Sequence, residues 1–450
     1  MMGVLAICTA IPTASFAQEK IVPDVTTQAE EMTFPWDLEK CIDYAIVHNI
    51  TIKTRELTVE DSQLNKSDAK WARLPNLNAS AGQNYNWGRS VSPETNTFSD
   101  VNSRSTSFSL STSVPLFTGL RIPNQYKLSK VQLAASLADL EQAKEDLSVQ
   151  IAQQYLQVLF TKELFGIAKE QAQLSQTQYE RFQQLFQVGK TAQSDVAEAQ
   201  ARVAQDQYSV TSANNDYQLA KLDLAQLLEL SSMDQFSIVS PTNITVDNVL
   251  IPIDEVYSNA LNTRAEMRAA TLRYKGSKYS IAIANSAYYP TLSAGGNLGT
   301  GYNKIGGFDA EGFSKQLDHN LNKSVGISLS IPIFNRFSTR NNVRRARLQR
   351  DQYALQLDDT KKKLYKEIQQ AWYNAAASQA QYESALVAKQ ANQEAFNLMQ
   401  KKFMQGQATS LQFTESKINL MKSVSEQLQA KYQYLFRTKI LQFYDGQALK

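Results

Sequence analysis

Side chains that commonly carry enzyme chemistry are scarce in this sequence. It has two histidines, His48 and His319, which are 271 positions apart in unlike contexts, and two cysteines, Cys8 and Cys41. A zinc or copper site needs several such ligands close together, and we find no Ser-His-Asp or phosphate-loop pattern. The sequence therefore predicts a protein that is not an enzyme and that needs no cofactor or metal ion.

Clusters of basic residues are the second candidate for function. Charge runs of this kind are usually solvated helix faces. Their repetition directly after two alternating segments also suggests contact with anionic lipid headgroups or an anion-attracting channel segment. Over the whole chain, 46 basic residues are mixed with 43 acidic ones, which does not fit the basic face of a nucleic-acid-binding protein. The clusters are Arg340, Arg344, Arg345, Arg347 and Arg350 in the second half, and Arg121, Lys127 and Lys130 in the first.

The elements that position these residues occur twice. Pro115 and Pro332 are 217 positions apart, as are Gly189 and Gly406, whereas Pro75 and Pro290 are 215 apart. A constant offset at separate landmarks indicates an internal duplication. The change by two residues predicts a length difference in a loop between the strands of each copy, where insertions are tolerated.

Four segments alternate strictly between apolar and small polar residues, at about 77–87, 105–116, 291–302 and 323–334. Period-2 alternation predicts strands with one apolar and one polar face. The polar face is rich in Ser, Asn and Gly, and strands of about 10 residues suffice to span a bilayer. Aromatic residues end the strands as in membrane-interface girdles: Tyr85, Trp87 and Tyr302 at the loop ends, and Phe117 and Phe334 at the helix ends.

Four strands cannot close into a barrel, and open sheet edges are not viable in lipid. We therefore expect oligomerisation, with three chains supplying a twelve-stranded barrel. The mature chain has no apolar run of about 18 residues that would predict a membrane-spanning helix.

Two very long helices follow the strand pairs, at about 123–186 and 339–403. At 1.5 Å per residue each would reach about 95 Å, and heptad-spaced leucines predict coiled-coil support. Each helix ends at a glycine that favours a left-handed cap, Gly189 or Gly406. Ser194 and Ser410 are the predicted N-caps of helices that return from these turns.

The N-terminus has the features of a secretory signal peptide. An apolar stretch precedes Ser15 and Ala17, which predicts cleavage before Gln18. The usual basic residues are missing, which leaves a native start further upstream open. Lipidation of Cys8 is disfavoured because a bulky isoleucine precedes it.

This order of elements resembles the TolC-like outer-membrane efflux protein family over nearly the whole mature chain, about 36–446. The resemblance rests on SVPLF at 113–117 and SIPIF at 330–334, on LPNL at 74–77 and YPTL at 289–292, and on the turn segments at 181–200 and 401–416. It implies a homotrimer in the outer membrane whose helical tunnel crosses the periplasm and docks, tip first, on a periplasmic adaptor (membrane fusion) protein. An inner-membrane efflux pump or ABC transporter would deliver the cargo.

The same resemblance implies roles for residues around the two turns. The tips would dock the adaptor, and acidic residues beyond them would narrow the periplasmic entrance. Only one of the two matching positions beyond Gly406 is acidic, and Ala408 stands where some members have a basic residue that locks the tip. The expected tip residues are Gly189, Lys190, Thr191, Gly406, Gln407 and Ala408, and the expected constriction residues are Asp195, Glu198, Gln412 and Glu415. Capping of a helix is the alternative role for these acids.

We thus expect a mixed, mostly α fold with four strands per chain in a trimeric 12-stranded β-barrel, continuous with a coiled-coil tunnel. The expected divisions are a signal peptide (1–17), a first repeat (18–230, with its long helical hairpin at 123–230), an equatorial linker (231–253), a second repeat (254–445, hairpin at 339–444) and a tail (446–450). The expected function is an exit duct for efflux or type I secretion. A periplasmic adaptor and a coiled-coil or adhesin stalk are the alternatives, and neither explains the duplicated strand pairs.

Overall fold

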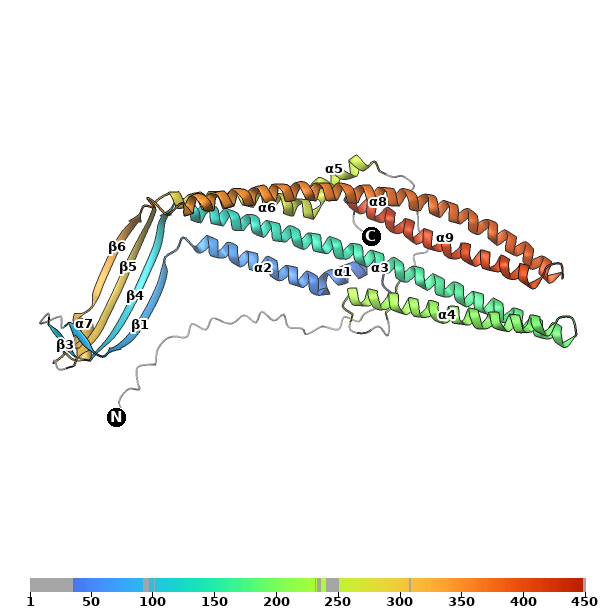
Figure 1. Cartoon of the computed structure of the whole chain (residues 1–450), viewed down its shortest axis with the longest axis horizontal. Helices are drawn as coiled ribbons and strands as arrows, with labels where there is room; N and C mark the ends of the chain where they lie inside the picture. The colour runs from blue at the N-terminus through green and yellow to red at the C-terminus, as the bar shows by residue number, and fades with distance from the viewer. Residues whose placement is uncertain are drawn as a thin grey trace, which may run out of the picture.

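The computed structural model describes residues 35–91, 97–100, 102–230, 232, 236–239, 251–306 and 309–447. The molecule is elongated, with a sheet at one end and two helical hairpin tips at the other (Figure 1). The predicted signal peptide, Cys8 and most of the predicted linker lie outside the described residues.

The sheet has four antiparallel strands in the order β1-β4-β5-β6. The strands are β1 (Asn76–Asn86), β4 (Ser103–Thr118), β5 (Thr291–Ile305) and β6 (Asn322–Ser330). The two repeats therefore contribute one strand pair each, joined through β4 and β5. Within the chain, β1 and β6 are the outer strands of this sheet.

The strand register places like residues beside one another on each face. Ala79 lies opposite Leu110, which lies opposite Leu298, so the apolar positions align across three strands. On the other face, Ser109 lies between Ser80 and Gly299, and the Ser80 and Ser109 hydroxyls are 2.7 Å apart. The period-2 prediction is confirmed because every strand keeps its apolar residues on the same side.

The loop end of the sheet is more ordered than the sequence indicated. A short hairpin, β2 (Arg89–Val91) and β3 (Phe98–Asp100), follows β1, and helix α7 (Phe313–His319) lies between β5 and β6. The loop sequences, at about 88–104 and 303–322, carry no regular pattern that would have predicted these elements. The strand predicted at 323–334 ends at Ser330 because β5 begins at Thr291, the partner of Ser330, and offers nothing further to pair with.

Two 67-residue helices, α3 (Arg121–Gln187) and α8 (Ser338–Met404), form the length of the molecule. Each turns back into a 35-residue helix, α4 (Gln193–Leu227) or α9 (Ser410–Tyr444). Both predicted hairpins are present, and each spans most of the distance from the middle of the molecule to the tips in Figure 1.

Shorter helices run from the middle of the molecule toward the sheet. They are α1 (Leu38–His48) and α2 (Ile50–Trp71) in the first repeat, and α5 (Ile253–Thr263), α6 (Ala265–Asn285) and the 3-10 helix η1 (Ser286–Tyr288) in the second. The sequence pattern predicts one continuous helix in each place, at about 37–70 and 254–286. Each is interrupted instead by an extended residue, Asn49 (φ −63°, ψ 130°) or Arg264 (φ −66°, ψ 131°).

The duplication is visible in the element bounds. From α3 and α8 onward, the bounds of the two copies differ by 217, whereas both bounds of α1 and α5, and the first residues of α2 and α6, differ by 215. The additional two residues therefore lie between the short helices and the long ones, in the strand and loop region as predicted.

Both long helices start from a strained corner. Leu120 (φ 65°) and Phe337 (φ 60°), which are 217 positions apart, precede the helices in the left-handed conformation. Gly119 is left-handed too, and a Cβ atom there would lie 2.5 Å from the Ser286 carbonyl oxygen. Glycine is therefore required at this corner, where the first repeat contacts the second.

The main core lies at mid-length, where α1, α3, α4 and α9 meet. Trp36 forms a parallel bridge with Ile238, and the Tyr155 hydroxyl donates to the Val239 carbonyl oxygen at 2.7 Å. The described parts of the N-terminal segment and of the 231–253 segment thus pack around the long helices. A second core joins α5, α6, α8 and α9, and a small third one lies near the tips.

Candidate channel entrance and membrane sheet

The two hairpin tips have the same backbone geometry. Gly189 (φ 70°) and Gly406 (φ 74°) are left-handed, as predicted for residues that end a helix. The next amide in each tip donates back across the turn, from Lys190 to the Leu185 carbonyl and from Gln407 to the Lys402 carbonyl, both at 2.8 Å. The tips are therefore preformed turns with exposed backbone.

The returning helices are capped differently from the prediction. The N-cap of α4 is Ala192 and that of α9 is Thr409, so the assignment of Ser194 and Ser410 as caps is wrong. The Thr409 hydroxyl accepts a hydrogen bond from the Gln412 amide at 3.2 Å. Ser410, one position after Thr409, and Ser194, two positions after Ala192, already lie inside their helices and are not placed to cap them.

Two of the four expected constriction residues take part in these caps. The Asp195 carboxylate accepts hydrogen bonds from the Thr191 hydroxyl and, at 3.3 Å, from the Ala192 amide. Gln412 accepts from the Thr409 amide at 3.1 Å. The alternative that the first-turn residues serve as caps therefore describes Asp195 and Gln412.

The other two residues, Glu198 and Glu415, are exposed one turn further along α4 and α9. They are 217 positions apart, as are Asp195 and Gln412, so the two tips present related sets. Exposed carboxylates at the tip end of the molecule create a negative field that attracts cations.

A cavity of about 280 Å³ lies between the two tips. Its apolar walls include Phe182, Leu185, Phe403 and Phe413, and Arg181 lies at its lining. Four of the predicted tip residues line the cavity: Lys190, Thr191, Gly406 and Ala408. An apolar recess with a few polar groups is typical of a surface that receives another molecule.

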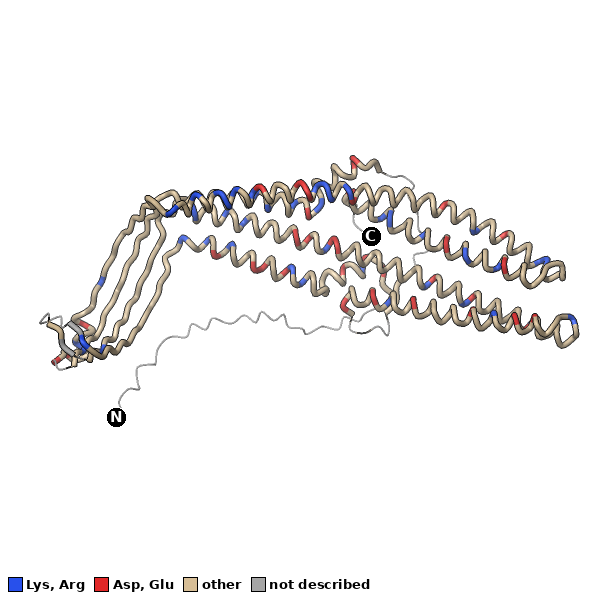
Figure 2. The backbone as a smooth tube through the Cα atoms, in the orientation of Figure 1, with Lys and Arg blue, Asp and Glu red and all other residues tan. Residues whose placement is uncertain are grey.

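The sheet at the opposite end is almost free of charge, as Figure 2 shows, whereas basic residues gather at the start of α8. Its apolar face is open: Val325 is 91% and Ile327 72% exposed. An exposed apolar surface of this extent marks an interaction site or a membrane contact.

The aromatic residues expected at the membrane interface lie in unlike surroundings. Tyr85 and Trp87 are exposed and stack on each other with centroids 6.1 Å apart. Phe117 and Phe334 are exposed at the helix end of the sheet. Tyr302 differs, because it is only 7% exposed.

Helix α7 covers Tyr302. The Tyr302 ring lies 5.2 Å from that of Phe313, and the Arg104 guanidinium lies 5.4 Å from the Tyr302 ring centroid. The sequence did not predict a helix in this loop, so it gave no sign of this cover. Tyr302 is therefore not open to the surroundings of the sheet in the way that Tyr85 and Trp87 are.

Two buried polar groups at the helix interruptions were not predicted from the sequence. The Asn49 amide donates to the Leu227 carbonyl at 3.2 Å and so ties α2 to the end of α4. Arg264 lies 3.3 Å from a Glu145 carboxylate oxygen of α3 and stacks over Phe443 of α9. Asn49 and Arg264 are 215 positions apart, which is the offset of the duplication in this region. This equivalence was the signal in the sequence that could have pointed to them.

Carboxylates gather around Arg264 on neighbouring helices. Burial is the largest cause that raises the pKa of Glu145, Asp146 and Glu266, while the Arg264 charge opposes the rise in each case. These groups join both repeats at mid-length, away from the entrance.

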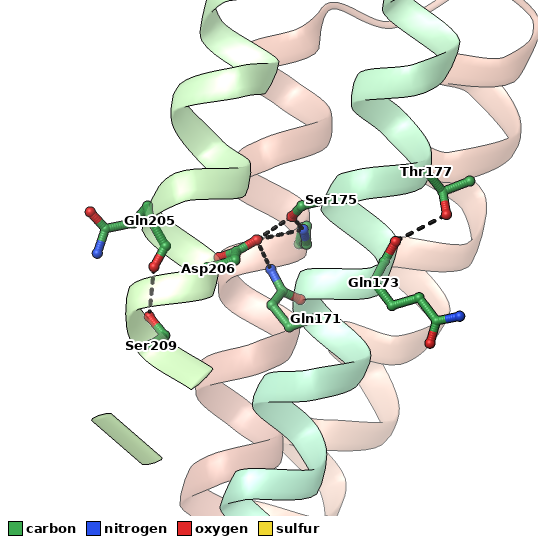
Figure 3. Close-up of polar contacts among 8 residues, drawn as sticks. Gln171, Gln173, Ser175, Thr177, Gln205, Asp206 and Ser209 are labelled. Carbon is green, nitrogen blue, oxygen red and sulfur yellow. Dashed lines mark hydrogen bonds and ion pairs between the residues drawn. The ribbon is translucent and has the colours of Figure 1, made fainter. Parts of the chain in front are cut away.

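A third unpredicted polar group lies between the two hairpins (Figure 3). The Lys417 ammonium of α9 donates to the Ser175 hydroxyl of α3 at 2.7 Å and lies 3.4 Å from the Asp206 carboxylate of α4. Ser175 also donates to Asp206. Nothing in the heptad pattern distinguished these residues from solvated positions.

Within the part of the chain that the structure describes, no group of three or more His, Cys, Asp and Glu side chains is arranged to hold a metal ion. In the same residues, none of the helices has the length and apolarity needed to cross a membrane.

Comparison with known proteins decides the family. Residues 41–229 and 256–447 match the family described as outer membrane efflux protein. The chain belongs to this family. The two matched segments correspond to the two repeats, and membership makes this chain an outer-membrane channel protein whose helices extend into the periplasm.

Individual relatives of this outer membrane efflux protein are distant in sequence. It is 24% identical to the alkaline protease secretion protein AprF of Pseudomonas aeruginosa over 80% of this chain and 75% of that one. It is 23% identical to the outer membrane protein TolC of Escherichia coli, over 82% and 74% of the two chains.

Solved structures agree in fold. The CmeC outer membrane channel of Campylobacter jejuni superposes with a TM-score of 0.77 at 19% identity, over 92% of this chain and 86% of that chain. The CusC structure gives 0.77 at 16% identity, over 91% and 92%. The TolC-like resemblance and the mixed, mostly α fold expected from the sequence are thereby confirmed.

Proposed function

We propose that this outer membrane efflux protein is the exit duct of a tripartite efflux or type I secretion system. Three copies would form one continuous passage from a periplasmic adaptor to the cell exterior, without catalysing a reaction. The observation that carries the proposal is a four-stranded sheet with lipid-compatible residues on one face, joined directly to two long helical hairpins. Four strands must be completed by other chains, because an open edge in lipid leaves backbone groups unsatisfied.

An exposed apolar seam supports closure by copies of the same chain. Along α2, the large apolar residues Ile50, Leu57, Leu64 and Trp71 recur every seven positions and are between 53% and 64% exposed. Helix α2 leads into the outer strand β1, and the other outer strand, β6, leads to α8, where Leu348 and Leu355 are also exposed. Heptad spacing on both sides of the protomer fits head-to-tail packing around a ring.

We propose that the tips dock an adaptor. The cavity between them offers an apolar surface lined by Phe182 and Phe403, with Lys190, Thr191, Gly406 and Ala408 around it and Gly189 and Gln407 in the adjoining turns. An adaptor side chain of moderate size would fill such a recess. An efflux pump or an ABC transporter in the inner membrane would supply cargo. The relatives of this chain include both the alkaline protease secretion protein AprF and the probable efflux pump outer membrane protein TtgC of Pseudomonas putida.

Glu198 and Glu415 are the residues that we propose for the charged entrance. Three copies of each would form rings that favour cations. Asp195 and Gln412 are assigned to the caps on which these helices start, so they would act by positioning the rings. Tyr85, Trp87, Phe117 and Phe334 are proposed to lie at the membrane interfaces.

The test is single-channel recording of the purified, unheated protein, combined with its mass in detergent. We expect a particle of three chains that conducts and prefers cations. Glu415→Gln should reduce the cation preference, and Glu394→Gln, an exposed charge on α8, should not. A non-conducting monomer would refute the duct. Equal reversal potentials for wild type and Glu415→Gln would refute only the entrance assignment.

A further inference from the structure

At the loop end of the sheet, two cations lie side by side on the apolar face. Arg104 of β4 and Lys304 of β5 are directly opposite each other in the strand register. Side chains alternate along a strand, so these two residues share the face that carries Phe108 and Leu298. Tyr85 of β1 lies opposite Arg104 on its other side. One phenol and two cations therefore form a row across three strands of one chain.

Neither cation has an anionic partner among the residues that the structure describes. Arg104 donates to the Tyr302 hydroxyl at 3.5 Å and lies 5.4 Å from its ring centroid, so its partner is neutral. Lys304 is exposed, and Glu311 of the same loop pairs with His319 at 3.0 Å. Like charges at directly opposite positions destabilise a sheet. The chain leaves this cost uncompensated, and an anion held between the two side chains would remove it.

Toward the middle of the sheet, the same face becomes apolar. Phe108 lies opposite Thr300, and Leu110 lies opposite Leu298. At about 3.3 Å per residue, Phe108 and Leu110 lie about 13 and about 20 Å along the strand from Arg104. A shallow hollow of about 430 Å³ lies over these rows. Its apolar lining includes Ala79, Ala81, Phe108, Leu110, Leu298 and Leu321. The face therefore has cations toward the loops and an apolar hollow below them, which is the arrangement that an amphiphile requires.

The position of this face in the membrane decides what can reach it. The helices extend into the periplasm, so the loop end of the sheet faces the cell exterior, and the cationic row lies at the level of the outer leaflet (Figure 1). Pairing with neighbouring chains would use the edges of β1 and β6 and leave the faces of β4 and β5 uncovered. The surrounding lipid is therefore the molecule that contacts both the row and the hollow.

The charge of the row indicates the kind of headgroup. A phosphomonoester carries a charge of about −1.5 to −2 at neutral pH, which matches two cations, whereas a phosphodiester headgroup carries a single negative charge. Arginine binds two phosphate oxygens in a fork geometry, and lysine adds a point charge. The Tyr85 hydroxyl, at the end of the row, can donate a further hydrogen bond.

We propose that Arg104 and Lys304 bind the phosphomonoester of a glycolipid in the outer leaflet, and that an acyl chain of this lipid lies in the hollow over Phe108 and Leu298. The site depends on the outer-membrane location of the sheet and not on the proposed passage of cargo. It does not involve the basic residues at the start of α8, which lie at the opposite, periplasmic end of the sheet (Figure 2).

Reversal of one charge separates lipid binding from sheet stability. Lys304→Glu places a carboxylate opposite Arg104, and opposite charges at such positions stabilise a sheet. The lipid-free trimer should therefore keep or raise its Tm, while its affinity for the phosphorylated glycolipid should fall by about tenfold or more. Lys304→Gln, which removes the charge without reversing it, should give an intermediate affinity.

The experiment is native mass spectrometry of the purified trimer, titrated separately with three lipids. These are lipid A with two phosphomonoesters, the same lipid after enzymatic removal of its phosphates, and phosphatidylglycerol. The matched control carries Lys362→Gln with Lys366→Gln, which remove charge at exposed positions on α8, outside the sheet. The Tm after delipidation establishes that each variant folds. If Lys304→Glu does not assemble, Lys304→Gln takes its place.

Tight binding of lipid A by wild type and control, with binding about tenfold weaker for the dephosphorylated lipid and for Lys304→Glu, would support the site. Equal binding of lipid A by wild type and Lys304→Glu would overturn it, as would equal binding of lipid A and its dephosphorylated form. Phosphatidylglycerol bound as tightly as lipid A would overturn the assignment to a phosphomonoester. The Lys304→Glu trimer should conduct like wild type, so failure of the duct would appear in channel recordings and failure of this site only in the lipid titration.

Discussion

Gly189 and Gly406 allow a prediction at the scale of single residues. Gly406 has φ 74°, and no atom lies within 4 Å of the position that a Cβ would take. Gly406→Ala therefore creates no clash, and its cost comes from the left-handed backbone, about 1–2 kcal/mol. We expect faster hydrogen exchange at the Gln407 amide, which closes the turn, while the amides of the α8 interior keep their protection.

Asparagine provides the matched control at this position. Asn tolerates the left-handed conformation better than Ala, so Gly406→Asn should preserve most of the protection at Gln407. Equal exchange rates in the two variants would show that side-chain volume, and not backbone conformation, determines the stability of the tip.

Glu266 allows a prediction about pH. Burial, followed by the nearby Glu367 charge, raises the pKa of Glu266 above its ordinary value of 4.5. The folded chain therefore binds a proton more readily than the unfolded chain does. This group costs stability above its raised pKa, and the cost disappears as the pH falls toward 4.5.

Glu266→Gln should accordingly raise Tm at the upper end of a range from about pH 8 to about pH 5, and the difference from wild type should shrink toward the lower end. Glu255→Gln, at an exposed position on α5, serves as the control. A difference in Tm that stays constant over the whole range would contradict the assignment of the effect to Glu266 ionisation.

At the scale of elements, a charge is expected to have different effects on the two faces of β4. Leu110 lies near the middle of the strand on the apolar face, and Ser111 follows it on the polar face. Arg at a lipid-facing position costs about 2–4 kcal/mol at the bilayer midplane, whereas positions inside a barrel tolerate charge. Leu110→Arg should reduce the yield of heat-resistant trimer, and Ser111→Arg should leave it near the wild-type value. Equal yields would mean that the apolar face does not contact lipid.

The interruption between α1 and α2 gives a second prediction for elements. Asn49 caps α2 by accepting from the Thr51 amide at 2.9 Å, and it also donates to the Leu227 carbonyl. Asn49→Ala removes both contacts and should lower the free energy of unfolding by about 1–2 kcal/mol. Asn49→Ser keeps a capping hydroxyl and loses the donor to Leu227 without adding a charge, so denaturant unfolding should rank it between Ala and wild type.

These elements also show how far the sequence determines the fold. Period 2 predicted the strands and heptad spacing predicted the long helices, because both patterns arise from a repeated local geometry. Gly189 and Gly406 were predictable since their backbone conformation favours glycine. The helix interruptions at Asn49 and Arg264 were not predictable, because the polar side chains of these residues find their partners on other helices. Lys417 and Tyr302 were missed for the same reason: their burial depends on α3 and α7, which lie far from them in the sequence or were not predicted.

At the scale of the whole molecule, the sheet and the α2 seam must be completed together. Each outer strand is connected to a helix with exposed apolar residues, β1 to α2 and β6 to α8. Pairing of β1 with the β6 of a neighbouring chain would therefore bring the α2 and α8 seams side by side. Apolar side chains at heptad spacing supply most of the free energy of such a contact. Charges placed on the seam should therefore prevent assembly without unfolding the hairpins.

The variant that tests this carries Leu57→Glu and Leu64→Glu, two of the exposed seam residues. Its control carries Thr58→Glu and Asn65→Glu, which add the same charge at exposed positions one residue away. We expect the control to keep the mass of three chains and the seam variant to lose it, while both retain their helical circular dichroism. Because burying a carboxylate without a partner is strongly unfavourable, a seam variant that still formed trimers would place these leucines outside the interface. The outer strands β1 and β6 of neighbouring chains would then pair in an assembly in which the helices pack differently.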